Sequence, residues 1–355
     1  MEVNYIDALG VEYTEFAVRD IEASSKMYEE MQFECLGYRT DRNRKSKLFG
    51  QGDIRVVLST GLNETDLASK FVNKHGDGVL TLAYRVDSAK NAIQIASSKS
   101  AKPAIPVEQL KGSGESVQEL SAIQLYGDVL NAFVSYSKNG SLEDLFSENR
   151  KTISSSKGKM LQSVDHITVN VEKGKVDYWA KFHKELFGFD QVRYFDIRTG
   201  RTGLISRALR NPNGRVTMPF NEPTDPKSQI QEFVDTFHGP GVQHIAYHTS
   251  NILSALGDLR EKGFKFLTVP DTYYDEVPKR VPTLKEDLER VKELGILVDG
   301  SDKGYLLQIF TENMVGPFFF EFIQRRGDDG FGEGNFRALF EAIERDQIRR
   351  GVLSA

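Results

Sequence analysis

The stretch GPGVQHIAYHT (residues 239–249) carries two of the six histidines of the chain, His244 and His248, four residues apart. On a helix, this spacing would place both imidazoles on one face, close enough to share a metal ion. On a strand, the two side chains would share a face but lie about 13 Å apart, too far for one ion. The choice between helix and strand therefore decides both the fold and the chemistry of this stretch.

An internal repeat favours the strand. Residues 76–93 (GDGVLTLAYRVDSAKNAI) follow the same plan as residues 239–256 (GPGVQHIAYHTSNILSAL): Gly, any residue, Gly-Val, a strand-like run and then a helical one. The Gly-Pro-Gly start is typical of a turn that leads into a strand. We therefore expect His244 and His248 on one strand, where they cannot bind one ion together.

The repeat extends along the rest of the chain. Matching pairs are the alternating strands at 10–18 and 163–171, the helical stretches at 21–38 and 175–189, the strand-rich runs at 49–60 and 203–220, and the apolar closing strands at 130–137 and 316–325. The sequence NPNG at 211–214 predicts a hairpin turn. A lysine- and serine-rich segment, KTISSSKGKM, separates the halves. We predict a first domain at residues 1–150, a linker at 151–160 and a second domain at 161–355.

The overall composition is that of an ordinary globular protein, with 39% hydrophobic and 27% charged residues. A net charge of −5 gives no reason to expect nucleic acid or an anionic membrane as a partner. The single cysteine, Cys35, excludes an internal disulfide framework and fits a reducing compartment. The first residues show no signal-peptide pattern, and no apolar run has the length needed to cross a bilayer. We therefore expect a cytoplasmic protein that binds neither nucleic acid nor membranes.

The two halves differ at three matched strand positions, where only the second half carries residues that bind metals. The pairs, with the second half first, are His166 and Tyr13, His244 and Thr81, and Glu321 and Ser135. Two imidazoles and one carboxylate form the facial ligand set of non-haem Fe(II) oxygenases, which leaves coordination positions open. The comparison between halves therefore predicts one metal site in the second half.

Each of these residues also has a plainer interpretation. A single histidine in a strand is more often a satisfied core or surface residue than a metal ligand. Glu321 lies within FFFEFI (residues 318–323), where a buried carboxylate needs a strong partner. Its alternative is a solvated position on the face opposite Phe320 and Phe322. The density of aromatic residues favours a bound cation.

Six segments of the second half resemble the 4-hydroxyphenylpyruvate dioxygenases of the vicinal oxygen chelate superfamily. They are VDHITVNV, MPFNEPTDPKSQIQEF, HGPGVQHIAYHT, LGILVDGSDKGYLLQIFT, FFFEFIQRRG and GFGEGNFRALFEAIE, in the family's order between residues 163 and 344. The first half matches only the fold plan, as expected for the family's non-catalytic N-terminal domain. The resemblance implies an α+β fold of two tandem vicinal-oxygen-chelate domains. Each domain would consist of paired βαβββ modules that form an open barrel, and a C-terminal helix would close over the site as a lid.

The resemblance also implies the functional residues. Fe(II) would be bound by His166, His244 and Glu321, the same three residues that the comparison between halves selects. The positions that match the family's substrate pocket are Ser206, Asn221, Gln229, Gln243, Gln308, Phe310, Phe319, Asn335 and Phe336. The phenylalanines could pack against an aromatic ring, and the polar residues could bind a phenol hydroxyl or a carboxylate. Taken alone, each fits ordinary core or turn chemistry equally well. Gln243 precedes a ligand and would point to the opposite face unless a bulge redirects it.

The activity implied by the resemblance belongs to tyrosine and phenylalanine catabolism. It converts 4-hydroxyphenylpyruvate and O2 to homogentisate and CO2 through oxidative decarboxylation, ring hydroxylation and side-chain migration. A homo-oligomer, either a dimer or a tetramer, is also implied. The nearest alternative is a 4-hydroxymandelate synthase acting on the same substrate, and Pro219 and Phe336 favour the dioxygenase.

More distant alternatives belong to the same superfamily. An extradiol dioxygenase or a glyoxalase-type isomerase would lack the NEP, LLQIFT and GNF segments. A non-enzymatic small-molecule-binding protein would have no use for the metal ligand set.

Overall fold

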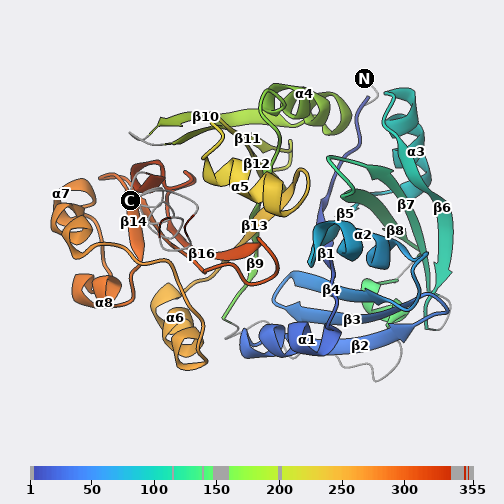
Figure 1. The fold of residues 1–355 in the computed structure, drawn as a ribbon, viewed down its shortest axis with the longest axis horizontal. Helices are drawn as coiled ribbons and strands as arrows, with labels where there is room; N and C mark the ends of the chain where they lie inside the picture. Colours follow the sequence, from blue (N-terminus) through green and yellow to red (C-terminus); the bar gives the residue numbers. More distant parts are fainter. Residues whose placement is uncertain are drawn as a thin grey trace.

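The computed structural model describes residues 4–113, 116–137, 140–146, 160–198 and 202–336, together with Ile348 and Gly351. Each half of the chain forms one eight-stranded mixed sheet, and Figure 1 shows the first half (blue to teal) beside the second (green to red). The predicted α+β fold of paired βαβββ modules is confirmed. The predicted linker, apart from Met160, and most of the predicted C-terminal helix lie outside the described residues, so the domain boundaries and the lid stay predictions.

The first sheet joins two modules side by side. The first module consists of β1 (Gly10–Ala17), α1 (Ile21–Glu30), β2 (Glu34–Thr40), β3 (Arg44–Gln51) and β4 (Ile54–Gly61). The second consists of β5 (Gly78–Arg85), α3 (Ala89–Ser98), β6 (Pro103–Lys111), β7 (Val117–Gln124) and β8 (Leu130–Tyr136). The strand order is β2-β3-β4-β1-β5-β8-β7-β6, so β1 and β5 pair antiparallel at the centre. Helix α2 (Leu67–His75) links the modules, and a short helix, η1 (Leu142–Leu145), follows β8.

The second sheet repeats this order as β10-β11-β12-β9-β13-β16-β15-β14. Its first module consists of β9 (Ser163–Asn170), α4 (Val176–Phe187), β10 (Asp190–Arg198), β11 (Gly203–Arg210) and β12 (Thr217–Pro223). Its second consists of β13 (Gly241–His248), α6 (Ile252–Glu261), β14 (Leu297–Gly300), β15 (Tyr305–Phe310) and β16 (Phe319–Arg326). The remaining helices are α5 (Gln229–Thr236), η2 (Asp271–Glu276), α7 (Val277–Arg280), α8 (Leu288–Glu293) and η3 (Glu333–Asn335). Residues 241–248 are thus a strand, as the repeat predicts.

Local sequence explains where several elements begin and end. The Asp20 carboxylate accepts the backbone N–H groups of Glu22 and Ala23, which fixes the start of α1. Helix α4 ends at Gly188, whose φ of 70° is the left-handed conformation that glycine adopts most easily. The predicted hairpin between β11 and β12 is confirmed, with Gly214 at a φ of 76°.

The helix expected over residues 21–38 is wrong in its second half. Helix α1 ends at Glu30, Gln32 has a φ of 64°, and β2 begins at Glu34. Gly37 lies within β2, where an added Cβ would collide with the carbonyl oxygen of Phe146. Tertiary pairing with β3 and the close approach of the segment after β8 override the local helical pattern.

The counterpart of Glu321 in the first half is Ala132 and not Ser135, so the expected register of the closing strands is wrong by three residues. Both Glu321 and Ala132 pair with an alanine of the neighbouring central strand. Ser135 matches Gln324 instead, since each side chain accepts the first backbone N–H of the helix that follows the central strand of its module, α3 after β5 or α6 after β13. A register error of this kind is expected when a uniformly apolar strand offers no internal marker.

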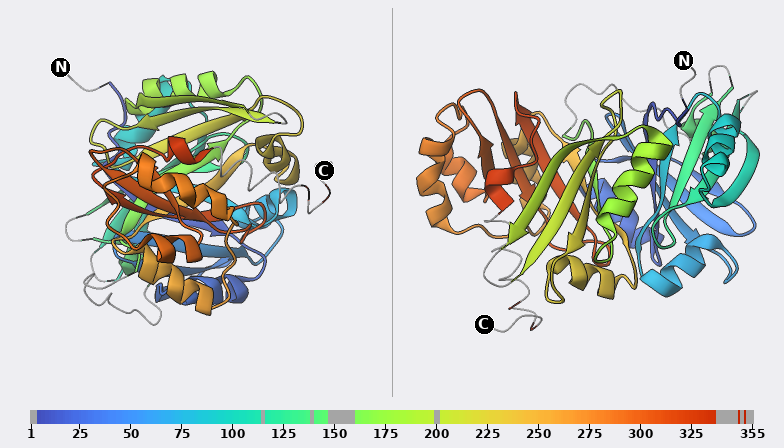
Figure 2. Two further views of the ribbon diagram at one scale, coloured as in Figure 1. Left: turned by 90° about the vertical axis from the view of Figure 1, so that its left-hand side faces the viewer. Right: turned by 90° about the horizontal axis from the view of Figure 1, so that it is seen from above.

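One hydrophobic core runs through both halves. Edge-to-face ring pairs cross between them at Phe16–Phe318 (5.1 Å), Tyr28–Phe320 (6.0 Å) and Tyr126–Trp179 (5.3 Å). Seen from above in Figure 2, α4 (light green) lies toward the first half, where Phe187 packs on Tyr84. The halves are therefore joined by aromatic packing. Within the part of the chain that is described, the structure contains no helix of the length and apolarity that spanning a membrane requires.

Candidate metal centre and pocket

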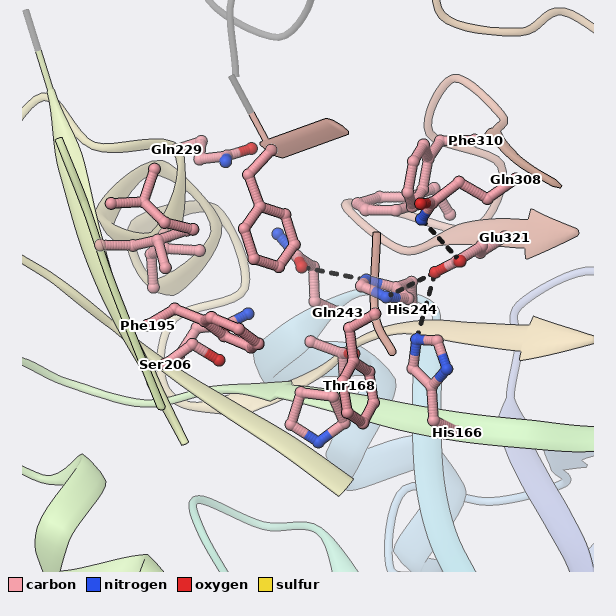
Figure 3. A pocket seen from close by; sticks show the side chains of 18 residues that line it. His166, Thr168, Phe195, Ser206, Gln229, Gln243, His244, Gln308, Phe310 and Glu321 are labelled. Atoms are coloured by element: carbon pink, nitrogen blue, oxygen red, sulfur yellow. Dashed lines mark hydrogen bonds and ion pairs between the residues drawn. The ribbon is translucent and has the colours of Figure 1, made fainter. Parts of the chain in front are cut away.

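Three strands of the second sheet bring His166, His244 and Glu321 together. They lie on β9, β13 and β16, and a ligand atom from each lies within 4.8 Å of the others. Glu321 Oε2 is 3.1 Å from His166 Nε2 and 3.4 Å from His244 Nε2, and Figure 3 shows the three groups converging. All three residues are buried. The site that the sequence predicts from two distant histidines and one carboxylate is thus assembled by the sheet.

Two β-bulges place an extra side chain next to each histidine. In the pairing of β9 with β13, Gln243 and Asp165 have no opposite residue, since the register shifts at each of them. A bulge turns the extra residue toward the face of its neighbour, so both side chains reach the histidine that follows them. The first half has bulges at the matching positions, Glu12 and Leu80. The bulges are therefore a property of the fold and not of the metal site.

The bulged residues bind the Nδ1 atoms of the two histidines. Asp165 Oδ1 is 2.8 Å from His166 Nδ1, and Gln243 Oε1 is 3.1 Å from His244 Nδ1. When Nδ1–H donates to these oxygens, the lone pair of each imidazole is on Nε2, the atom that faces Glu321. These contacts orient both imidazoles with Nε2 toward Glu321, the nitrogen that a neutral ring would offer to a metal.

The charges at the site fit a bound cation. Burial alone would raise the pKa of Glu321, but His166 and His244 outweigh it and lower that pKa to about 2. Burial lowers the pKa of His166, yet Glu321 and Asp165 raise it to about 9, so a proton there balances the carboxylates. Burial lowers the pKa of His244, which Glu321 offsets only in part. Because a ligating imidazole is neutral, a metal ion would replace the proton on His166 as the partner of Glu321.

The donor set also fits a metal ion chemically. Imidazole nitrogen and carboxylate oxygen are common ligands of divalent transition metals, and three of them leave positions open for substrate. Gln308 Nε2 donates to Glu321 Oε1 (3.1 Å), which leaves Oε2 directed at the histidines. His166, His244 and Glu321 can therefore hold a metal ion, and Gln308 fixes the orientation of the Glu321 carboxylate.

A pocket opens beside the ligand set and contains most of the residues that the sequence predicts. Predicted residues in its lining are Ser206, Asn221, Gln229, Gln243, Gln308, Phe310, Phe319 and Phe336. In Figure 3, Ser206 and Gln229 lie across the pocket from Glu321 and His166. Among the described residues, the side chains of Ser206 and Gln229 form no hydrogen bond. These two groups are therefore free to bind a ligand.

Asn335 does not line the pocket. Its Nδ2 donates to Gln308 Oε1 (3.0 Å), and its Oδ1 accepts from the Tyr273 hydroxyl (2.6 Å). Asn335 therefore acts indirectly, because it fixes the side chain of Gln308, which lines the pocket. Gln243 does line the pocket, but its oxygen is already directed at His244.

Sequence reasoning missed part of the lining. The additional residues are Thr168, Phe195, Ile197, Leu204, Ile230 and Phe331. Thr168 lies two residues after His166 on the same strand, so the strand period could have identified it. Phe195 pairs with Ser206 across β10 and β11, a contact that depends on a register no local motif reveals.

Aromatic rings surround the ligand set and the pocket. Phe319 stacks on the imidazole of His244 at 4.7 Å, and Phe331 lies edge-on to His166 at 5.6 Å. Phe195 and Phe336 meet edge-to-face at 4.8 Å. The site thus combines open metal positions with aromatic walls suited to a flat ring.

Comparison with known proteins agrees with this geometry. The family model described as hydroxyphenylpyruvate dioxygenase, HPPD, N-terminal matches residues 3–147, and that of the glyoxalase/bleomycin resistance protein/dioxygenase superfamily matches residues 163–277. Protein MelA of Shewanella colwelliana is 39% identical over 99% of this chain and 99% of its own length. The 4-hydroxyphenylpyruvate dioxygenase of Pseudomonas aeruginosa is 41% identical over 99% of this chain and 97% of its own.

A solved structure gives the same result for the fold. A triple mutant of 4-hydroxymandelate synthase from Streptomyces coelicolor superposes with a TM-score of 0.84 at 26% identity, over 96% of this chain and 100% of that one. Both halves thus match in fold, and relatives match almost end to end in sequence. On these grounds the chain belongs to the 4-hydroxyphenylpyruvate dioxygenase family.

Proposed function

We propose that the protein is an Fe(II)-dependent dioxygenase that converts 4-hydroxyphenylpyruvate and O2 to homogentisate and CO2. The observation that carries the proposal is the buried set of His166, His244 and Glu321 facing an aromatic pocket. Full-length relatives named 4-hydroxyphenylpyruvate dioxygenase support the same substrate. The homo-oligomer implied by the resemblance and the cytoplasmic location expected from the composition stay predictions.

Fe(II) is the metal that the ligand set favours. Two histidines and one carboxylate on one face are the usual ligands of non-haem Fe(II) oxygenases. When bound, Fe(II) would supply open positions for the 2-oxo acid and for dioxygen, together with the electrons that activate oxygen. No second oxo acid is required, because the substrate carries its own.

The residues of the chain would hold the substrate in one orientation. The 2-oxo acid end would lie at the ligand set and the ring between the aromatic walls that Phe319 and Phe336 help to form. The phenol hydroxyl would then reach the opposite end of the pocket, where Ser206 and Gln229 offer a hydroxyl and an amide. Binding both ends of the substrate would fix the distance between the oxo acid and the ring carbon that is attacked.

The aromatic lining would also exclude water from the reaction. His166 and Glu321 are 4% and 2% exposed, and Phe331 is 7% exposed beside them. A site this dry protects a reactive oxidant from quenching by solvent and strengthens the electrostatic interactions inside it. This chain therefore supplies binding, orientation and shielding, while the metal supplies the redox chemistry.

A 4-hydroxymandelate synthase is the second candidate, because a mutant of such an enzyme superposes on this chain. That enzyme would share metal and substrate, and ring orientation would determine the product. Pro219 and Phe336 both line the pocket, and these are the residues that favour the dioxygenase.

Product identification separates the two candidates. The metal-free protein is loaded with Fe(II), supplied with O2 and 4-hydroxyphenylpyruvate, and the product is separated by chromatography. Homogentisate with one CO2 released per substrate is expected. Hydroxymandelate would support the second candidate, and a lack of turnover at every iron concentration would refute both.

A further inference from the structure

The carboxylate that orients His166 is itself held by a guanidinium. Arg325 Nε lies 2.7 Å from Asp165 Oδ2 and Arg325 Nη2 lies 2.8 Å from Asp165 Oδ1, a bidentate pair. The side chain of Arg325 is 19% exposed and that of Asp165 is 12% exposed, so solvent competes little for these contacts. Bidentate arginine–carboxylate pairs fix both partners in one plane. Asp165 is therefore held in the position from which its carboxylate accepts a hydrogen bond from His166 Nδ1–H.

The same guanidinium also holds the chain that follows β16. Arg325 Nη1 donates to the carbonyl oxygens of Asp328 (3.1 Å) and Gly330 (2.7 Å). The next residue, Phe331, lines the pocket edge-on to His166. We refer to residues 327–336 as the closing segment, because its residues Phe331 and Phe336 both line the pocket. One arginine thus contacts both the partner of a metal ligand and the start of the closing segment.

We propose that Asp165 and Arg325 are positioning residues that fix the metal ligand His166 and the closing segment as one unit. Through Asp165, the pair would keep His166 in the tautomer whose Nε2 faces the metal. Through Arg325, it would keep Phe331 against that same imidazole. Metal binding and closure of the pocket would therefore depend on each other. The inference rests on the proposed function only in taking the bound ion to be the catalytic metal.

The first half provides the matched control. Glu12 occupies the same bulge as Asp165, and the Tyr136 hydroxyl donates to its carboxylate at 2.7 Å, as Arg325 does to Asp165. The residue after Glu12 is Tyr13, which the metal set does not include. A variant at Glu12 therefore removes the same kind of bulge contact at a position with no metal ligand.

The first test measures metal binding without turnover. Metal-free protein is titrated with Co(II), whose visible absorption reports the affinity and the symmetry of its ligands. Asp165→Ala should weaken binding about 10- to 100-fold and change the spectrum, as losses of ligand-orienting partners do. Asp165→Asn retains an oxygen for His166 and should recover much of the affinity. Glu12→Ala should bind Co(II) like the unaltered protein.

The second test follows the closing segment by hydrogen exchange. Arg325→Met should speed exchange of the amides in residues 328–336 about tenfold or more, because it removes charge-assisted hydrogen bonds to that segment. Co(II) should slow this exchange in the unaltered protein and have little effect on it in Asp165→Ala. Equal protection by Co(II) in both proteins would refute the coupling.

The outcomes separate this inference from the proposed function. Unchanged Co(II) affinity and spectrum in Asp165→Ala would overturn the role of Asp165, whatever product the enzyme forms. If the unaltered protein binds metal but does not turn over 4-hydroxyphenylpyruvate, the proposed function fails while both tests still decide the positioning role.

An Arg325→Met protein that fails to fold is replaced by Arg325→Lys. Lysine preserves the charge but cannot bridge both partners, so normal exchange in that variant would also count against the inference.

Discussion

Glu321 is the residue on which the metal site depends most, because it is the carboxylate that both histidines face. Glu321→Gln preserves the size of the side chain but removes its charge. We expect metal affinity to fall by more than the 10- to 100-fold typical of ligand-orienting residues, with most activity lost and the fold intact. Metal content, turnover rate and circular dichroism measure the three quantities.

A buried carboxylate elsewhere controls for the loss of charge itself. Glu15 in the first half is 8% exposed and accepts hydrogen bonds from Arg44, Ser59 and Thr81. Glu15→Gln should reduce the stability of the protein but leave its metal content unchanged. Normal metal content and rate in Glu321→Gln would exclude Glu321 as a ligand.

His183 makes the stability of the fold depend on pH. Its ring is fully buried against Phe220 at 4.7 Å, and its Nδ1 donates to the carbonyl oxygen of Trp179 (2.9 Å). Burial lowers the pKa of His183 to about 4. Because this is below the unfolded value of about 6.5, the unfolded chain takes up the proton first, and stability is lost as the pH falls from about 6.5 toward 4.

The expected effect is large enough to measure. Between pH 7.5 and pH 5, His183 should account for a loss of about 2 kcal/mol in the free energy of unfolding. The substitution His183→Phe suits the aromatic surroundings and should remove this part of the pH dependence. Urea unfolding of the metal-free proteins at both pH values gives the difference. An identical pH dependence in both proteins would show that His183 is protonated in the folded state at pH 5.

At the level of elements, the predictions succeed where a pattern repeats and fail where packing decides. The strand at 241–248 and the hairpin between β11 and β12 follow from local turn and period signals. The second half of the expected helix at 21–38 fails, because β2 forms through pairing with β3, which no local signal marks.

The site shows the same division between local and long-range signals. Comparing the halves identifies His166, His244 and Glu321 without any contact information. It pairs Glu321 with the wrong residue, because register within an apolar strand is set by its neighbours. It also cannot anticipate the bulge at Asp165, since a bulge is a property of two paired strands.

The glycines on either side of α4 give a prediction about the cost of a side chain in the left-handed conformation. Gly188 has a φ of 70°, and an added Cβ would lie 3.0 Å from ring atoms of Tyr5. Gly174 precedes the same helix with a φ of 79° and nothing within 4 Å of an added Cβ. Alanine at either position should cost about 1–2 kcal/mol from the left-handed conformation, and Gly188→Ala should cost more because of Tyr5.

Urea unfolding of the two alanine variants isolates the Tyr5 contact. The two substitutions share the conformational cost, so the difference between their unfolding free energies measures the contact alone. A further Tyr5→Ala substitution should bring the cost of Gly188→Ala close to that of Gly174→Ala. Equal costs in the presence of Tyr5 would mean that the N-terminal chain does not constrain the end of α4.

At the scale of the whole molecule, the packing between the halves predicts that they unfold together. The core is continuous from one half to the other, and aromatic pairs cross between them. The one tryptophan, Trp179, belongs to the second half and packs on Tyr126 of the first at 5.3 Å. Its fluorescence therefore reports the second half and the contact between the halves. A large apolar interface couples the stabilities of the parts that it joins.

Leu48 offers the sharpest test of this coupling, because its hydrophobic cluster contains only first-half residues. Leu48→Ala should cost about 2–5 kcal/mol, the usual range for emptying a buried leucine site. If the halves unfold as one unit, the midpoint seen by Trp179 fluorescence must fall together with that seen by circular dichroism.

Leu306→Ala is the matched substitution, buried in a cluster of second-half residues only. Both variants should give coincident transitions by the two probes. A Trp179 midpoint that stays in place in Leu48→Ala while the circular dichroism midpoint falls would show that the first half unfolds independently and that the interface does not couple the halves.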